Sequence, residues 1–239
     1  MGAILLLALL GWAWMVALPP MQAPMSAGMD AMVMAGPRWT AARALATFAM
    51  WAIMMGAMML PSAAPIVLLH RRIAGVDRAT TPSTAWLTLG YVSVWTVFSA
   101  LATGVQWGLS QAALLTDSAA LVDRPVAAGV LIAAGLYQFA PVKQSCLRLC
   151  RSPVSFLMRS YRPGARGALR MGLIHGAFCL VCCWAAMALL FVGGVMNLLW
   201  ITGLSVFVLV EKALPFGETA GKALGLASAA AGGYLLIIR

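Results

Sequence analysis

One histidine and three cysteines interrupt an otherwise apolar stretch of the chain, residues 167–194. They are His175, Cys179, Cys182 and Cys183. On a helix that turns about 100° per residue, all four side chains fall within an arc of roughly 100° and share one face. Imidazole and thiolate groups are the usual ligands of zinc, copper and iron, and thiolates combined with thioethers select Cu(I). This face therefore predicts a metal site, most simply for Cu(I), with zinc and iron left open. The competing interpretation is that the cysteines pack as small apolar side chains.

A second group of soft donors follows helical spacing in residues 48–65. Its members are Met50, Met54, Met55, Met58 and Met59. The thioether sulfur is neutral, so it binds Cu(I) in lipid without losing a proton, although methionine is also a flexible filler of apolar cores. Counted at 1.5 Å per residue, both groups reach the middle of the bilayer. We therefore expect segments 44–69 and 168–193 to lie in contact, with Gly56, Gly172 and Gly176 allowing a close approach.

Two further groups lie outside these helices. Residues 19–38 carry Met21, Met25, Met29, Met32 and Met34. In an exported loop rich in Ala, Gly and Pro these thioethers suggest capture of Cu(I) or Ag(I), with an interfacial half-helix as the alternative. Cys146 and Cys150, four residues apart and flanked by arginines, suggest a cytoplasmic metal exit or redox role, or the packing of an interfacial helix. The adjacent Glu211 and Lys212 are expected to form an ion pair or to snorkel toward the interface.

The elements that must position these residues are membrane helices. Of 239 residues 63% are hydrophobic and 9% are charged, where a soluble domain carries about 25% charged residues. Mean hydropathy is +0.93. Apolar runs near the ~20 residues that cross a bilayer occupy 2–18, 44–69, 84–109, 125–142, 168–193, 196–213 and 220–238. We predict an all-α, polytopic transmembrane bundle of six or seven helices in a single domain, residues 1–239. Segment 2–18 is expected to be an uncleaved anchor rather than a cleaved signal, because it has no basic start.

The distribution of basic residues predicts the orientation. In an alternating topology, twelve of the 16 Lys and Arg residues fall on the side of segment 141–170 and four on the other. The positive-inside rule makes the richer side cytoplasmic, which places loop 19–38 outside. The charge of +10 is therefore explained by topology, and no nucleic-acid partner is expected. Segment 143–166 is predicted to be a basic surface segment on the anionic inner leaflet of a bacterial inner membrane.

Several motifs resemble a known bacterial family. They are "MWAIMMGAMMLPSAAP", "GLYQFAPVKQSCLRLCRSP", "MGLIHGAFCLVCCW" with "VMNLLW", and "EKALPFG", in this order between residues 48 and 217. The chain is similar here to a family of predicted metal-binding integral membrane proteins. The resemblance implies that His175, Cys179, Cys182 and Cys183 occupy the family's HGxxCxxCCW-like motif. It implies also that Cys146 and Cys150 occupy its CLxxCRSP-like motif, and it suggests a small soluble partner.

These observations predict a membrane protein that binds Cu(I) at mid-membrane and transfers or delivers it. In this role loop 19–38 captures the ion, and the methionine face passes it to the histidine and the cysteines. The lipid bilayer and a soluble metal-carrying protein are the expected partners. An enzyme is the less favoured class, since a quinone-linked thiol oxidoreductase would need cysteines near an aqueous face. A structural or assembly subunit of a larger membrane complex is the main alternative.

Overall fold

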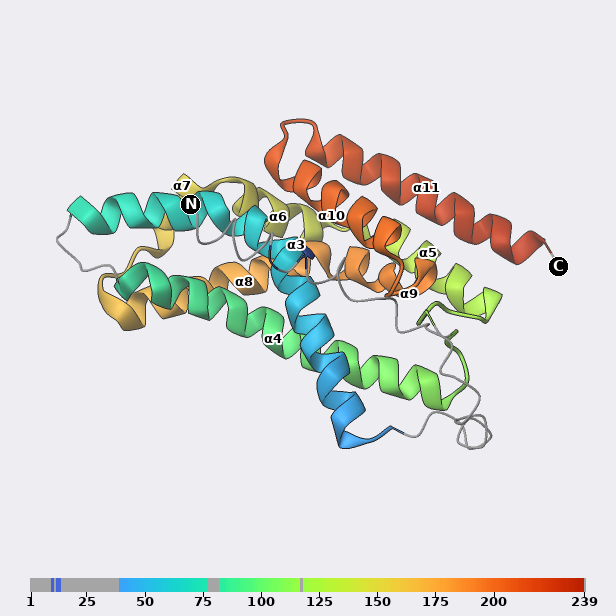
Figure 1. Ribbon diagram of the computed structural model, residues 1–239. Coiled ribbons are helices and arrows are strands. Elements are labelled where there is room, and N and C mark those ends of the chain that lie inside the picture. The colour runs from blue at the N-terminus through green and yellow to red at the C-terminus, as the bar shows by residue number, and fades with distance from the viewer. Residues whose placement is uncertain (1–9, 11, 14–38, 77–81, 117, 239) are drawn as a thin grey trace.

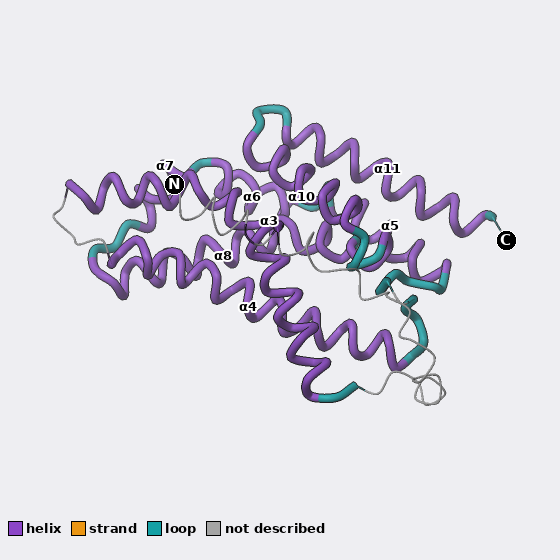
Figure 2. Tube along the Cα trace, in the orientation of Figure 1, coloured by secondary structure: helices purple, strands orange, loops and turns teal. Residues whose placement is uncertain are grey.

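The computed structural model describes residues 10, 12–13, 39–76, 82–116 and 118–238. The helices are α3 (Ala41–Val76), α4 (Pro82–Gln111), α5 (Arg124–Tyr137), α6 (Pro141–Arg151), α7 (Pro153–Ser160), α8 (Gly164–Ala188), α9 (Leu190–Gly193), α10 (Leu198–Ala213) and α11 (Gly217–Ile237). Apart from one isolated bridge between Leu115 and Leu121, regular structure in the described residues is helical, as Figure 2 shows. The predicted all-α class is confirmed.

Four helices are long and apolar enough to cross a membrane, namely Ala41–Ile73, Ser83–Gln111, Gly164–Gly193 and Gly217–Ile237. A fifth span is formed if α5 and α6, which meet at an angle of 63°, are counted together. The protein is therefore a multi-pass membrane protein. Predicted segment 196–213 corresponds to α10, whose 16 residues fall short of the ~20 that a span needs. Predicted segment 2–18 lies almost wholly outside the described residues.

The closest contacts between helix backbones are made at glycines. A Cβ atom added at Gly172 would overlap the Leu87 carbonyl of α4, and one added at Gly90 would overlap the Leu169 carbonyl of α8. Two backbones can approach this closely only where no side chain separates them. The main partner of α8 is therefore α4, which packs along it (Figure 1).

The expectation that α3 and α8 pack along each other through their glycines is therefore wrong. Gly56 of α3 has no atom within 4 Å of an added Cβ, so it makes no close contact between helices. Gly172 and Gly176 belong to the contact with α4 instead. Spacing alone placed small residues on one face of each helix, and it could not say which other helix would meet that face.

Helix α3 crosses the bundle and is tied to α4 by a buried hydrogen bond from Trp51 Nε1 to Gln106 Oε1, 2.7 Å long. Figure 1 shows α3 bending part-way along its length, as expected for a helix that contains Pro61 and Pro65. The bend lets α3 follow the bundle past α8, with α7 packed against its C-terminal part.

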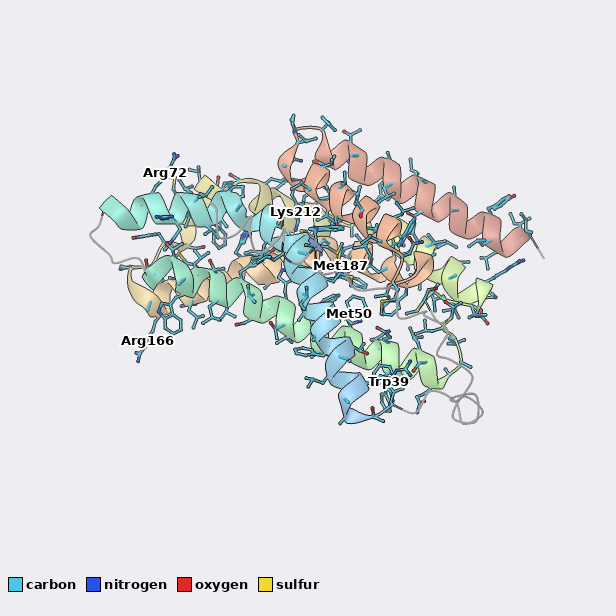
Figure 3. All side chains as sticks on the ribbon, in the orientation of Figure 1. Trp39, Met50, Arg72, Arg166, Met187 and Lys212 are labelled. Carbon is cyan, nitrogen blue, oxygen red and sulfur yellow. The ribbon has the colours of Figure 1, made fainter. Side chains whose placement is uncertain are left out.

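The two ends of the bundle carry different residues. In Figure 3 Arg72 and Arg166 extend from one end, while Trp39 lies at the other. The rings of His70 and Tyr161 lie 6.3 Å apart at the first end and join the C-terminal part of α3 to the segment before α8. At the second end Trp39 Nε1 donates to Ser110 Oγ over 2.6 Å.

Candidate metal centre

The three cysteines of α8 share one buried face, as their spacing predicts. Cys179, Cys182 and Cys183 each expose 1% or less of their surface. The thiols of Cys182 and Cys183 donate to the same acceptor, the Cys179 carbonyl, over 3.0 and 2.9 Å. This bonding to the preceding turn satisfies the two thiols inside an apolar helix.

A fourth thiol comes from a different helix. Cys150, near the end of α6, packs against the buried cluster that contains Cys179 and Cys182, and its thiol interacts with theirs. Cys146 is buried one turn earlier on α6. The sequence left Cys146 and Cys150 with either an exit or redox role or the packing of an interfacial helix, and in the structure Cys150 packs beside the α8 thiols.

A lysine lies among the sulfur atoms. The Nζ atom of Lys212, from α10, lies 2.8 Å from Cys179 Sγ, 3.9 Å from Cys183 Sγ and 4.0 Å from Met59 Sδ. Only 8% of this residue is exposed, and Figure 3 places it at the centre of the bundle. Lys212 therefore supplies a positive charge at the point where sulfurs from α3 and α8 meet.

Tyr91 ties three helices together at this point. Its hydroxyl lies 3.1 Å from Cys179 Sγ and 3.1 Å from the Met59 carbonyl, which accepts a hydrogen bond from it. The side chain is 1% exposed and comes from α4, the helix that packs along α8. Tyr91 thus fixes the position of Cys179 relative to α3.

The methionines of α3 line the same core. Met54, Met55, Met58 and Met59 are buried in one apolar cluster with the α8 cysteines, and the half-buried Met50 packs against it. Met59 is the methionine whose sulfur lies nearest Lys212 Nζ. We refer to Cys150, Cys179, Cys182, Cys183 and Met59 as the sulfur cluster.

His175 lies one turn before Cys179 and is 3% exposed. Its ring packs between the rings of Tyr91 and Phe156, with centroid distances of 5.7 and 5.3 Å. The Nδ1 atom is buried without a hydrogen-bond partner. His175 is therefore a neighbour of the sulfur cluster that keeps one nitrogen free for a ligand.

The expected pair of Glu211 with Lys212 is wrong. Glu211 forms a buried ion pair with Lys143 of α6, and each side chain is 1% exposed. Consecutive helical residues do not face each other, so Glu211 and Lys212 point to different neighbours. The same contact removes Lys143 from the surface role expected for segment 143–166, although Arg148, Arg159, Arg162 and Arg166 of that segment are exposed.

The side-chain positions are not those of a metal-bound centre. Among the described residues, no group of three or more His, Cys, Asp or Glu side chains is arranged to hold a metal ion. Two thiols are turned toward the Cys179 carbonyl, and an ammonium lies between sulfurs. The donor types nevertheless fit a soft monovalent ion, because thiols and a thioether gather around Cys179.

Sequence reasoning missed Tyr91 and Lys143 and misplaced Lys212. An ionisable residue inside an apolar segment is a functional candidate by default, and this signal applied to Lys212, in predicted segment 196–213, but not to Lys143, which follows predicted segment 125–142. Nothing in the spacing of Tyr91 distinguished it from other aromatic residues. The methionines predicted to capture metal, Met21, Met25, Met29, Met32 and Met34, lie outside the described residues.

Comparison with known proteins shows which family the chain belongs to. A family model described as "PpoB2: Copper chaperone" matches residues 48–235. The chain belongs to the PpoB2 copper chaperone family. No curated protein and no solved structure matches the chain.

Membership makes copper the metal that this protein handles and confirms the expectation drawn from its soft ligands. The match to the PpoB2 family begins within α3 and ends within α11, so it contains all of the sulfur cluster. Loop 19–38 lies before the matched region.

Proposed function

We propose that this copper chaperone holds Cu(I) at the sulfur cluster and hands it to a client protein. The observation that carries the proposal is the convergence of four thiols from α6 and α8 beside a thioether from α3. Donors on one helix all approach from the same side, so a metal needs ligands from a second helix. Cys150 meets that requirement for the three cysteines of α8.

The chemistry of the donors favours Cu(I) over harder ions. Thiolates and thioethers select Cu(I), and Glu211, the neighbour of Lys212 in the chain, is paired with Lys143 instead. Of the four thiols, Cys179 is the central one, because it contacts Cys150, Lys212 and Tyr91. His175 Nδ1, buried and unpartnered, is the candidate nitrogen ligand at the edge of the site.

The methionines of α3 would form a path to the cluster. Met50, Met54 and Met58 follow one another at one-turn intervals from the half-buried Met50 toward Met59. Neutral thioethers bind Cu(I) weakly enough to pass it on, while thiolates hold it more firmly. In this proposal the methionines of loop 19–38 capture the ion outside. Cys146, one turn from Cys150, would be an exit ligand toward a soluble partner or larger membrane complex.

The proposed location is a bacterial inner membrane with segment 141–170 in the cytoplasm. The gathering of Arg72 and Arg166 at one end of the bundle, opposite Trp39, supports this orientation. Two of the twelve basic residues, Lys143 and Lys212, are buried and do not contribute to the surface charge. The remaining ten still outnumber the four on the other side.

The test is a titration of Cu(I) against a chromophoric Cu(I) chelator, using full-length protein purified in detergent under reducing conditions. The wild type is expected to bind one Cu(I) per chain. Cys179→Ser is expected to lower the affinity at least tenfold, since it removes the central thiol.

A matched pair on α6 separates the sulfur cluster from a general effect of losing a cysteine. Cys150→Ser is expected to weaken Cu(I) binding severalfold or more, whereas Cys146→Ser, one turn away, should leave it within about twofold. Equal affinities in the wild type and in the Cys179→Ser and Cys150→Ser variants would contradict the proposed site.

A further inference from the structure

Lys212 has an unusual environment for a buried lysine. Its nearest polar neighbours are sulfur atoms, with Nζ 2.8 Å from Cys179 Sγ and 3.9 Å from Cys183 Sγ. A buried ammonium is costly unless a negative group compensates it, and carboxylates normally do so. The feature to be explained is a fixed positive charge at a proposed cation site.

The two carboxylates that lie closest to Lys212 in the chain are paired with other lysines. Glu211 pairs with Lys143, and Glu218 pairs with Lys222 over 3.0 Å. Throughout the described ranges, no carboxylate lies within ion-pair distance of Lys212. The groups that face Lys212 Nζ are therefore the sulfur atoms of Cys179, Cys183 and Met59.

The charge of the ammonium acts on any metal in the cluster. The two thiols within 4 Å of Lys212 Nζ are Cys179 and Cys183. When these two bind Cu(I) as thiolates, the complex carries one negative charge, which Lys212 neutralises. Two thiolates and a divalent ion are neutral by themselves, so beside Lys212 they leave one uncompensated positive charge. Such a charge is disfavoured in a buried site, where electrostatic interactions are weakly screened.

We infer that Lys212 makes the sulfur cluster selective for monovalent Cu(I) over divalent thiophilic ions such as Zn²⁺. The inference rests on the proposed copper site. Zinc is the relevant competitor because it takes the same thiolate and imidazole ligands. The three sulfurs nearest Nζ are two thiols and one neutral thioether, a set whose charge suits a monovalent ion.

The experiment compares the affinities of the purified full-length protein for Cu(I) and Zn(II), each measured by chelator competition. Lys212→Met is expected to reduce the ratio of Cu(I) affinity to Zn(II) affinity at least tenfold. Lys212→Arg keeps the charge and should retain the ratio within about threefold. Lys222→Met makes the same chemical change at an exposed lysine and should not alter it.

A second variant without the charge is needed in case Lys212→Met does not fold. Lys212→Gln keeps a hydrogen-bond donor for Cys179 without the charge, and circular dichroism and gel filtration verify its fold. An unchanged ratio in the folded neutral variants would overturn the inference, as would an equal fall in Lys212→Arg.

Failure of the proposed function gives a different pattern. In that case Cys179→Ser binds Cu(I) as tightly as the wild type, whatever the variants of Lys212 do. Loss of Cu(I) binding in Cys179→Ser, together with an unchanged ratio in Lys212→Gln, would refute the role of Lys212 alone.

Discussion

Replacing Glu211 with glutamine is expected to destabilise the protein strongly, because it breaks the buried ion pair with Lys143. Both side chains are 1% exposed, and Glu211 Oε2 has no hydrogen-bond partner in the described structure. Glutamine has almost the same shape as glutamate, so the change removes charge without opening a cavity. What remains is a buried lysine without its counter-ion.

The size of the expected loss of stability follows from the burial of the ion pair. Removing one partner of a buried ion pair costs about 3–5 kcal/mol. For a chain of this size, about 2–4 °C of melting temperature corresponds to each kcal/mol, so Tm should fall by roughly 6–20 °C. The exposed pair of Glu218 and Lys222 is the matched control. Glu218→Gln should barely change Tm, because water screens an exposed pair.

The assay is thermal unfolding of both variants in the same detergent, followed by circular dichroism. The double variant Glu211→Gln/Lys143→Met should recover much of the lost stability, because it leaves no unpaired buried charge. A Tm of Glu211→Gln that equals that of Glu218→Gln would refute the reasoning. It would mean that Lys143 and Glu211 are accessible to water or are not paired.

Two other predictions concern packing and orientation. Gly172→Ala should destabilise the bundle, because its Cβ would overlap the Leu87 carbonyl. Gly56→Ala is the control and should leave the stability unchanged, since its added Cβ meets nothing within 4 Å. Thermal unfolding of the two variants measures the difference. A reporter fused within 143–166 should stay cytoplasmic and one fused within 19–38 should be exported. An exported reporter at residue 150 would reverse the orientation.

The sequence predicted the class of protein and the face that the three α8 cysteines share. Apolar runs and low charge were sufficient for a multi-pass helical protein, because crossing lipid imposes length and composition on each helix. Helical periodicity placed Cys179, Cys182 and Cys183 on one face, and in the structure this face is buried. These results depend on local geometry, which the order of residues determines.

Contacts between helices could not be obtained in the same way. The spacing of Gly172 and Gly176 indicated a close approach of two backbones, but the partner proved to be α4 rather than α3. Adjacency of Glu211 and Lys212 suggested a pair, whereas the helix directs them to α6 and to the sulfur cluster. Periodicity says which residues share a face, and tertiary packing decides what that face meets.

The account depends most on copper being bound by sulfur at the cluster around Cys179. X-ray absorption spectroscopy at the copper edge, on protein loaded with one equivalent of Cu(I), measures this directly. We expect two or three sulfur neighbours at about 2.3 Å, the length of a metal–thiolate bond. We expect this shell to be lost or replaced in Cys179→Ser. A first shell of nitrogen or oxygen atoms, or a spectrum unchanged by the substitution, would contradict the account.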